Sequence, residues 1–485
     1  MKTVPKVAHL NFLSEDQIQA IHDTSIRLLG THGFRCDSRL IFDIFARSGA
    51  NVDETERIIR LPPDMIEGAL ASAPSSFVLY GRDPAMDLLA EAGRPYFGMG
   101  GTSEPFVWDY DLGLPRPPTV ADMVRNTRLA QSCENIDFVM AICSAGDVPK
   151  SEIYLHEYDA IFRNTTKPVI YTAPGRQFTA GYIQLAIAAS GGETAFRARP
   201  WIVLYTQPVC PMVIGEYSEG MIEAAQFGIP LMAAPGPQMG ATSPATLAGT
   251  LAQINAEALF NVVLAQLIKP GIPVIYGPQT GVMDMAAYQS TYGSAEQAVA
   301  RAAVAQLGRH YDLPSFGLGG GVEAKLPDAE AAAEATMGIV LNALAGLTLT
   351  QTLGTMASGL YGAPEMVLIC DEVVRMARRI LQGIRVDKIA LAEEVIRDVG
   401  HGGQFLTHDH TLEHFRSELY FPKVFRRQSI ADWKEHGAKS MLDVAHERVL
   451  SILDSIEPIA LPEGADEAMR DALREASQRL SPPSA

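Results

Sequence analysis

Short apolar runs alternate with longer helical patterns between residues 95 and 356, and this rhythm constrains the fold more than any other feature. Several of the runs begin after proline, which a strand tolerates at its first position. The eight runs lie at 96–101, 138–145, 168–173, 201–207, 230–235, 273–278, 315–320 and 347–353. Eight strands, each followed by a helix, is the count of a (β/α)8 barrel. The rhythm therefore predicts an α/β chain built around a TIM barrel.

Helical periodicity follows each run, but the alternation alone would also suit a doubly wound open sheet. A dinucleotide-binding sheet would carry Gly-x-Gly-x-x-Gly after its first strand. The stretch Gly98-Met99-Gly100-Gly101 lacks the third glycine at that offset. The count of eight and the missing fingerprint both favour the barrel.

The regions on either side of the barrel are predicted to be mostly helical. Residues 1–90 form an N-terminal extension, and its first helix has a capping box with Ser14 as N-cap and Gln17 three residues later. Residues 91–381 form the catalytic barrel. Residues 382–485 form a C-terminal helical extension that we expect to pack on the barrel.

The composition excludes several classes of function. The net charge is −17 and no basic patch is present, so the chain is not expected to bind nucleic acid. Five widely spaced cysteines without a Cys-x-x-Cys motif indicate a reduced protein. The first residues lack the apolar core of a signal peptide, and the sequence has no stretch of about 18 uninterrupted apolar residues, so we expect no transmembrane helix. We expect a cytoplasmic protein without a membrane partner.

The first predicted strand combines glycines with an acid at its end. Gly98, Gly100 and Glu104 share one face, because alternate residues of a strand point the same way. Glycine inside a strand often marks a close approach to the backbone. This face could clear space for a ligand beside the carboxylate. Alternatively, the barrel interior is crowded enough there to require glycine.

Barrel enzymes carry their sites at the C-terminal ends of the strands, and the polar residues found there define a candidate pocket. We assign catalytic roles to Glu104, Tyr276, Gln279 and Glu323. We assign substrate binding to Tyr96, Tyr171, Tyr205, Gln207 and Thr352. In the last strand the Thr348, Thr350 and Thr352 face is expected to line the interior. In the seventh strand Phe316 and Leu318 are expected to face the helices.

The predicted pocket is rich in hydroxyl, amide and aromatic groups and poor in histidine and lysine. Neither a Ser-His-Asp triad nor a Schiff-base lysine is placed at a strand end, which argues against both mechanisms. Aromatic rings beside a carboxylate suit a cation, especially a quaternary ammonium. The alternative is that the tyrosines are core residues.

A histidine cluster near the C-terminus offers a different chemistry. His410, Glu413 and His414 match the H-x-x-E-H pattern of some zinc peptidases. On a helix the two histidines would share a face and could bind zinc. Asp409 and Thr411 also suit a plain helix start, so no metal ligand is assigned.

Motifs along nearly the whole chain resemble those of the trimethylamine methyltransferase superfamily. The run from Gly240 to Leu251 (Gly-Ala-Thr-Ser-Pro-Ala-Thr-Leu-Ala-Gly-Thr-Leu) is the most specific. Further similar stretches are Gly98–Ser103, Arg116–Thr119 with Asp122, Asn255–Glu257, Pro270–Gly277, Lys325 with Pro327–Ala329, and Gly400–Leu406 followed by His410 and Thr411.

The resemblance implies a TIM barrel that moves a methyl group from a methylated amine to a corrinoid protein. Archaeal trimethylamine enzymes of this family carry pyrrolysine, which this sequence lacks, so the chain looks like the non-pyrrolysine branch that includes glycine betaine methyltransferases. The implied substrate is a small quaternary or tertiary amine, most simply glycine betaine or a related betaine. Cob(I)alamin on a partner protein would be the methyl acceptor, with no cofactor held covalently.

The resemblance also implies partners for a betaine carboxylate, and His401, Arg116 and Arg176 are candidates beside Gln279. We further expect the chain to form a homo-oligomer. Two alternatives remain open at this point. One is a non-catalytic betaine- or cation-binding protein with the same fold, and the other is a zinc hydrolase that uses the histidine cluster.

Overall fold

The computed structural model describes the whole chain except residues 3, 8, 102 and 481–485. Eight parallel strands form its centre, and each neighbours the next in chain order. They are β6 (Tyr96–Met99), β9 (Phe138–Val139), β10 (Val169–Thr172), β11 (Ile202–Thr206), β13 (Leu231–Ala233), β15 (Val274–Tyr276), β18 (Phe316–Leu318) and β19 (Leu349–Leu353). A parallel bridge between Tyr276 and Ser315 joins β15 to β18 and closes the ring. The predicted TIM barrel is confirmed.

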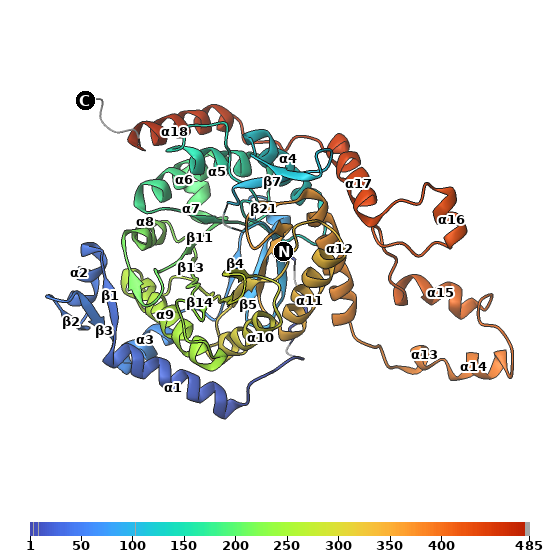
Figure 1. Ribbon diagram of the computed structural model, residues 1–485, viewed down its shortest axis with the longest axis horizontal. Helices are drawn as coiled ribbons and strands as arrows, with labels where there is room; N and C mark the ends of the chain where they lie inside the picture. The colour runs from blue at the N-terminus through green and yellow to red at the C-terminus, as the bar shows by residue number, and fades with distance from the viewer. Residues whose placement is uncertain (3, 8, 102, 481–485) are drawn as a thin grey trace.

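A shell of helices surrounds the strands, as Figure 1 shows in the view down the barrel. The helices are α4 (Val120–Ser132), α5 (Ile153–Asn164), α6 (Arg176–Ala189), α7 (Glu193–Ala198), α8 (Gly220–Gln226), α9 (Leu247–Ile268), α10 (Ala295–His310), α11 (Ala329–Ala345) and α12 (Pro364–Leu381). Local signals set several of their ends. Thr119 and Asp122 form a capping box at the start of α4. Gly346, at φ +72°, ends α11 in the left-handed conformation that glycine adopts freely.

Helix α9 is apolar on all sides, and neighbouring strands and helices cover it on all sides. Within the described residues it is the one helix long and apolar enough to cross a membrane, and 89% of its apolar window is buried inside the protein. It packs against β13 and β15 on one side and against α1 (Glu15–Thr31) and α3 (Pro63–Ser72) of the N-terminal region on the other. A helix of this kind is a core helix of the shell.

The N-terminal region also joins the barrel through its β-strands. β1 (Phe34–Cys36) and β3 (Ile58–Arg60) form a small sheet with β2 (Asn51–Asp53), next to α2 (Arg39–Arg47). The barrel adds β12 (Val213–Ile214) to this sheet, parallel to β1. The hairpin of β4 (Ser76–Leu79) and β5 (Leu88–Glu91) joins the apolar cluster inside the barrel through Leu79, Leu88 and Ala90. The expected capping box at Ser14 is present.

Short strands after the barrel strands build up the mouth. β7 (Phe106–Asp109), β8 (Leu114–Arg116), β20 (Thr355–Met356) and β21 (Tyr361–Gly362) form one sheet. β14 (Gln238–Met239), β16 (Gly281–Asp284) and β17 (Gln289–Thr291) form another. Each set follows the C-terminal end of a barrel strand, so the added chain gathers at one end of the barrel.

The C-terminal region divides into a part that packs and a part that projects. α17 (Met441–Ser455) and α18 (Ala465–Leu480) lie against the helical shell, and Arg163 pairs with Asp466 where α18 crosses α5. By contrast, α13 (Lys388–Leu391), α14 (Glu393–Val399), α15 (Asp409–Glu418) and α16 (Ile430–Glu435) extend away from the barrel (Figure 1). α17 and α18 therefore pack on the barrel, and the segment from Glu418 to Val424 also contacts α12.

The interior of the barrel is filled by large side chains, and two predicted strand orientations are wrong. Each strand contributes at least one residue to a compact cluster. The cluster contains Tyr96, Phe138, Ile170, Val203, Met232, Ile275, Phe316 and Leu349, together with six further side chains. Phe316 and Leu349 therefore face inward, although the sequence suggested otherwise. Thr350 faces out and contacts the Asn342 amide of α11.

The small residues of β18 and β19 serve the contact with the helical shell instead. A Cβ atom on Gly338 of α11 would lie 2.2 Å from the Gly319 carbonyl oxygen, so helix and strand backbones approach closely there. Glycine and threonine make that approach possible, and the bulky side chains on the other face fill the barrel. The register of β19 also shifts between Thr350 and Leu353, which alters the alternation near the strand end.

Gly98 makes room for a side chain of the barrel interior, so the crowded-interior alternative is the one observed. A Cβ atom built on Gly98 would lie 2.1 Å from Cε2 of Phe138. Phe138 is fully buried and cannot move outward without displacing its neighbours in the cluster. The glycine is therefore required by the aromatic ring beside it.

We expect Gly98→Ala to destabilise the protein by about 1–3 kcal/mol, because overpacking a close-packed core forces side chains off their preferred rotamers. Urea unfolding followed by circular dichroism measures the change. Gly98→Ala combined with Phe138→Leu should recover part of the loss. Gly68→Ala is the matched control, since no atom lies within 4 Å of its new Cβ in α3. Equal stability of Gly98→Ala and the wild type would contradict this role for Gly98.

Candidate active site

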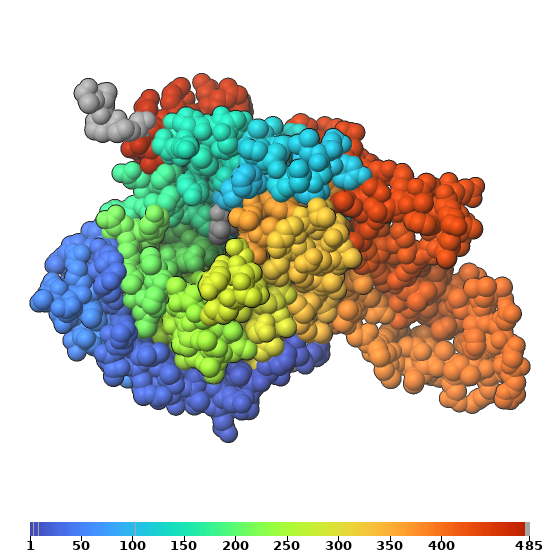
Figure 2. Space-filling view, in the orientation of Figure 1, coloured from blue at the N-terminus to red at the C-terminus, as the bar shows by residue number. Residues whose placement is uncertain are grey.

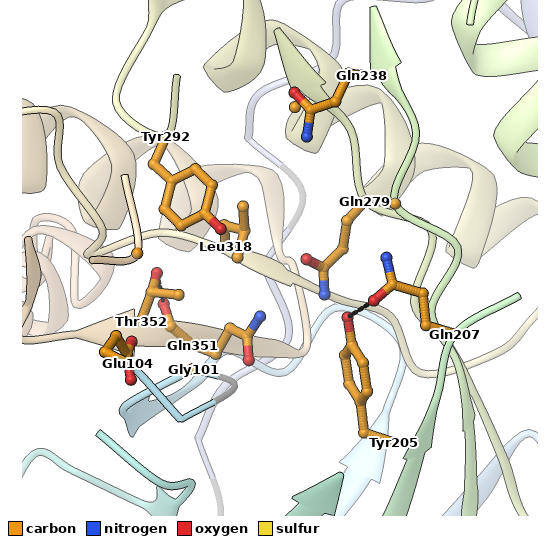
Figure 3. A pocket seen from close by; sticks show the side chains of 13 residues that line it. Gly101, Glu104, Tyr205, Gln207, Gln238, Gln279, Tyr292, Leu318, Gln351 and Thr352 are labelled. Carbon is orange, nitrogen blue, oxygen red and sulfur yellow. Dashed lines mark hydrogen bonds between the residues drawn. The ribbon is translucent and has the colours of Figure 1, made fainter. Parts of the chain in front are cut away.

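A small cavity of about 120 Å³ lies where the barrel strands end, and Figure 3 shows its side chains. Glu104 follows β6, Gln207 follows β11 and Gln279 follows β15. The full lining is Gly101, Glu104, Tyr205, Gln207, Gly236, Gln238, Gln279, Gly281, Tyr292, Leu318, Gln351, Thr352 and Gly359. Among these described residues there is one carboxyl group and no lysine, arginine, histidine or cysteine.

The cavity opens toward the protein surface through a wider cleft. This cleft has a volume of about 350 Å³, shares Tyr205 and Gln207 with the cavity, and extends outward past Tyr154 and Tyr217. Figure 2 shows the mouth of the barrel as a hollow between the green and yellow segments of the chain. A small ligand held in the cavity would therefore remain reachable from outside.

Five of the residues predicted from strand ends meet in this cavity: Glu104, Tyr205, Gln207, Gln279 and Thr352. Tyr205 is the one predicted tyrosine among them, and its hydroxyl lies 3.5 Å from Oε1 of Gln207. The strand-end argument works for these residues because all eight strands point to one mouth.

Three predicted tyrosines lie elsewhere, as core residues. The Tyr276 hydroxyl donates to Oδ1 of Asn255 on α9 at 2.7 Å, so this side chain faces the helices. Tyr171 packs among aromatic rings of α5 and α6. Tyr96 lies at the start of β6, and its hydroxyl donates to the Lys2 carbonyl. Tyr276 and Tyr171 face the helices, an orientation that residue type alone does not reveal. Tyr96 faces the interior but lies at the opposite end of its strand from the mouth.

Two predicted cationic partners also lie outside the cavity. The Arg116 guanidinium makes a two-bond ion pair with Asp122 at 2.8 Å and a further bond to Asp109, which ties the β7–β8 hairpin to the start of α4. His401 is exposed on the projecting part of the C-terminal region. Neither side chain contributes to the lining of the cavity in this chain.

Glu323 does not line the cavity but holds a neighbouring backbone segment in place. One of its carboxylate oxygens accepts hydrogen bonds from the backbone N–H groups of Tyr292 and Gly293. Nη1 of Arg301 donates to the Tyr292 carbonyl at 3.0 Å. These contacts hold the segment after β17 so that the Tyr292 ring lies over the cavity, close to Gly359. Glu323 therefore positions a lining residue.

The histidine cluster forms a helix start. His408 caps α15 by accepting from the His410 backbone N–H, and its ring lies 3.3 Å from an Asp398 oxygen. The rings of His410 and His414 lie side by side, 4.4 Å apart. Across the part of the chain that the structure describes, no three His, Cys, Asp or Glu side chains are grouped to hold a metal ion.

Sequence reasoning missed three polar lining residues. Gln351 was missed because the orientation of β19 was assigned the wrong way round. Gln238 and Tyr292 belong to excursions after β13 and β15, beyond the strand ends that were searched. The motif from Gly240 onward lies next to Gln238 and was the one available signal for that residue.

Glu104 is the most strongly perturbed acid of the site. It is 3% exposed, and the Thr355 hydroxyl donates to Oε1 at 2.7 Å. Burial raises the pKa of Glu104 to about 8, the Thr355 hydrogen bond opposes that rise, and the nearby Glu157 carboxyl adds to it. At neutral pH the side chain is therefore mostly a neutral acid unless a positive charge enters the cavity.

Three buried polar atoms of the lining lack a hydrogen-bond partner among the described residues. They are Oε2 of Glu104, Nε2 of Gln279 and Oε1 of Gln351. Leaving such an atom unpaired costs about 1–3 kcal/mol, and an unpaired group in a native protein calls for an explanation. Nε2 of Gln279 is a donor and Oε1 of Gln351 an acceptor, while Oε2 of Glu104 donates as a neutral acid and accepts when ionised. A polar ligand in this small cavity would satisfy such groups.

Thr352 adds a sign of strain at the same place. Its φ is +71°, a left-handed conformation that β-branched residues rarely adopt. The Thr352 hydroxyl accepts from the Gly321 N–H at 2.9 Å, and its own N–H donates to the Gly100 carbonyl at 2.8 Å. Residues held in such conformations by their surroundings concentrate at functional sites.

The fold and the cavity together define a class, namely a TIM barrel with a small polar cavity at its C-terminal mouth. Comparison with known proteins gives the family. The model of the trimethylamine methyltransferase (MTTB) family matches residues 2–480. The chain belongs to this family, and the methyltransferase activity expected from the sequence motifs is confirmed at that level.

Individual relatives agree with that assignment. A trimethylamine methyltransferase MttB of Desulfitobacterium hafniense is 34% identical over 470 residues, covering 95% of this chain and 93% of the relative. A glycine betaine methyltransferase of Desulfitobacterium hafniense is 31% identical over 457 residues, covering 93% and 94%. The solved Methanosarcina barkeri monomethylamine methyltransferase MtmB shares the fold at a TM-score of 0.53 and 12% identity, covering 98% of this chain and 88% of MtmB.

The buried acid predicts a pH-dependent stability difference. Folded Glu104 holds its proton up to about pH 8, whereas its ordinary pKa is 4.5. The wild type therefore loses stability through this group as the pH rises between those values. We expect Glu104→Gln to raise the melting temperature by several degrees at about pH 8 and by little at about pH 5.

Differential scanning calorimetry at the two pH values measures this difference. Glu56→Gln is the matched control, because Glu56 is exposed and its replacement should change the two melting temperatures alike. A pH-independent effect of Glu104→Gln would contradict the proposed burial of an unpaired carboxyl.

Proposed function

We propose that this protein takes a methyl group from a small quaternary amine, glycine betaine or a related betaine, and gives it to the cob(I)alamin of a corrinoid protein. The observation that supports the proposal most directly is the lining of the cavity, with one buried carboxyl group among uncharged amides and hydroxyls. No nucleophile such as cysteine or lysine stands among the described lining residues. A reaction whose nucleophile arrives with a second protein fits such a site.

Glu104 is the partner we propose for the cationic head of the substrate. A quaternary ammonium beside Oε2 would favour the ionised carboxylate and lower its pKa from about 8. Tyr205 and Tyr292 add aromatic rings, whose faces attract a cation. The charge on Glu104 then forms when the substrate enters, and an unpaired buried charge is avoided while the site is free.

The amide groups are the partners we propose for the other end of a betaine. Nε2 of Gln279 is a buried donor without a partner among the described residues, and Gln207 lies beside it in the cavity (Figure 3). A carboxylate needs donors, and amides supply them without adding a second positive charge near the reacting nitrogen. The absence of pyrrolysine from the sequence also supports a betaine more than trimethylamine.

The size of the cavity sets an upper limit on the substrate. A cavity of about 150 Å³ holds one benzene molecule, and this cavity of about 120 Å³ is slightly smaller. Compact methylated amines belong to this size class. Substrates with long side chains would have to extend into the outer cleft near Tyr217.

The residues also fit a corrinoid acceptor that approaches from outside. When bound at the mouth, the corrinoid supplies a nucleophilic cobalt. The chain itself holds the methyl-bearing nitrogen in a fixed position and keeps water away from it. As the N–CH3 bond breaks, its electron pair stays on nitrogen and the substrate loses its positive charge. Glu104 should therefore position the substrate without binding it too tightly, since excessive ground-state binding slows the chemical step.

All five cysteines are free thiols, which supports a reducing compartment such as the cytoplasm. The amine and a corrinoid protein are the partners of the reaction. A non-catalytic betaine-binding protein with the same cavity is the alternative. The assay of methyl transfer to cob(I)alamin distinguishes it from the enzyme.

Binding of glycine betaine should become tighter as the pH rises. Glu104 must release its proton to pair with the cation, and its pKa without ligand is about 8. From about pH 6 to about pH 9 we therefore expect affinity to increase by up to about 100-fold and then to level off. Isothermal titration calorimetry in two buffers of different ionisation enthalpy also counts the released proton.

Two controls make the charge role of Glu104 specific. Glu104→Gln should remove the pH dependence and weaken binding of glycine betaine. The carbon isostere 3,3-dimethylbutanoate, which lacks the positive charge, should lose little affinity in Glu104→Gln. Equal losses for both ligands would exclude the proposed pairing of carboxylate and cation.

Methyl transfer itself is tested with purified protein, glycine betaine and reduced cob(I)alamin. We expect dimethylglycine to form in step with loss of the cob(I)alamin absorbance. Gln279→Ala should lower the rate with glycine betaine, because the donor to the carboxylate is gone. Saturable betaine binding without dimethylglycine would favour the non-catalytic alternative. Failure of every small methylated amine to bind would contradict both.

A further inference from the structure

Helix α9 contains one charged residue, and that residue is buried. Glu257 is 0% exposed, and Gln253 precedes it by about one helical turn on the same side of the helix. Glu257 belongs to the motif Asn255–Glu257, and no lining residue that the structure describes comes from this motif. An acid buried in such a helix is costly unless hydrogen bonds satisfy it. The partners of Glu257 therefore show which part of the protein depends on it.

The first partners of Glu257 lie in the loop after β11, which bears Gln207. Oε1 of Glu257 accepts from the Met212 backbone N–H at 3.0 Å, and Oε2 accepts from the Cys210 thiol at 3.1 Å. Residues 209–213 form a tight turn that two backbone hydrogen bonds of 2.8 and 2.9 Å close. Glu257 therefore holds the far end of this loop, while Gln207 at its near end lines the cavity.

Gln253 extends the contact to the loop after β13, which bears Gln238. Its Nε2 donates to Oε1 of Glu257 at 3.0 Å and to the Thr242 carbonyl at 2.9 Å. The Thr242 hydroxyl in turn accepts from the Gln238 backbone N–H at 2.8 Å. The two neighbouring side chains of α9 therefore connect two loops that line the cavity. Thr242 lies in the motif from Gly240 to Leu251, so the network also includes that motif.

The two loops meet again at the cavity. A Cβ atom on Gly236 would lie 2.6 Å from Nε2 of Gln207, so the loop after β13 passes directly beside that amide. The Gln279 backbone N–H donates to the Pro235 carbonyl of the same loop at 2.7 Å. Figure 3 shows Gln207 and Gln279 on the side of the cavity opposite Glu104. A displacement of either loop would therefore move the amides relative to the carboxyl group.

We propose that Glu257, together with Gln253, is a positioning residue that holds the cavity amides of Gln207, Gln238 and Gln279 and thereby sets a preference for amines that carry a carboxylate. The inference rests on the proposed function, which gives these amides to the carboxylate of a betaine. Glu257 itself does not line the cavity, so it acts through them. A displacement of about 1 Å in a positioning group can cost on the order of 100-fold in rate.

The affinity ratio of two ligands tests this role. Glycine betaine carries a carboxylate, whereas tetramethylammonium presents the same type of cation without one. Glu257→Leu removes both acceptors and keeps a large side chain, so we expect betaine affinity to fall about 10-fold and tetramethylammonium affinity by less than about twofold. Glu257→Gln retains an acceptor for the Met212 N–H and should keep most of the betaine affinity. Isothermal titration calorimetry measures both ligands.

Variants along the same network show whether Glu257 acts through the amides. Gln253→Ala removes the link to Thr242 at a partly exposed position and should shift the ratio in the same direction. The loss caused by Glu257→Leu should be smaller in a Gln207→Ala background, because groups that act through one another are not additive. Asn261→Ala is the matched control and should leave the ratio unchanged. Asn261 is equally buried one turn along α9, and its amide donates to the Glu257 carbonyl within the helix.

Hydrogen exchange of the ligand-free protein, followed by mass spectrometry, tests the network without any substrate. Residues 207–214 and 236–243 should both exchange faster in Glu257→Leu and in Gln253→Ala than in the wild type. Asn261→Ala should change neither segment. Unchanged exchange of either segment in Glu257→Leu would overturn the inference. If Glu257→Leu does not fold, Gln253→Ala decides with the same two measurements.

The outcomes distinguish failure of this inference from failure of the proposed function. Equal weakening of glycine betaine and tetramethylammonium in Glu257→Leu would overturn the positioning role and leave the proposed function intact, as would an unchanged affinity ratio. A wild type that binds neither amine would contradict the proposed function and, with it, the carboxylate preference. Faster exchange of both segments would in that case still support a dependence of the two loops on Glu257.

Discussion

Closure of the strand ring is the constraint on which the rest of this structure depends. A helix returns the chain after each strand, so all eight strands are parallel. The bridge between Tyr276 and Ser315 joins β15 to β18 and closes the ring, so the strands end around one mouth. Each strand then places at least one large side chain inside, and together these side chains fill the interior. The polar residues that follow the strands have no other place to gather. A small enclosed cavity at that end follows from the closure.

The sequence predicted the barrel well because the signal for it repeats eight times. It predicted the site less well, since the site depends on which way single side chains face. Glu104, Gln207 and Gln279 follow their strands and needed only the general rule. The orientation of β19 was misjudged because threonine and glycine looked suited to a pocket, while their observed use is the close contact with α11. Small residues alternate along a strand in the same way whether their face lines a pocket or touches a helix backbone. The sequence pattern therefore could not show which face of β19 points inward.

Gln238 and Tyr292 show a second limit of sequence reasoning. Both reach the cavity from excursions beyond the strand ends, where no periodic pattern exists to place a side chain. Tyr292 depends on contacts that are distant in sequence, with Glu323 holding its N–H and Arg301 its carbonyl. Glu323 looked catalytic because an acid follows the seventh strand, and only the three-dimensional arrangement distinguishes an acid that holds a loop from one that faces a ligand.

The strand β12 has a consequence for how this protein can be divided. Residue 90 is a natural boundary along the sequence, yet β12 follows the loop that bears Gln207 and pairs with β1 of the N-terminal sheet. The hairpin of β4 and β5 likewise completes the apolar filling of the barrel from the other side of that boundary. A minimal barrel that begins at residue 91 would keep all eight strands but lose its floor and the edge that anchors one wall of the cavity. The functional module is therefore larger than the repeating unit that the sequence displays.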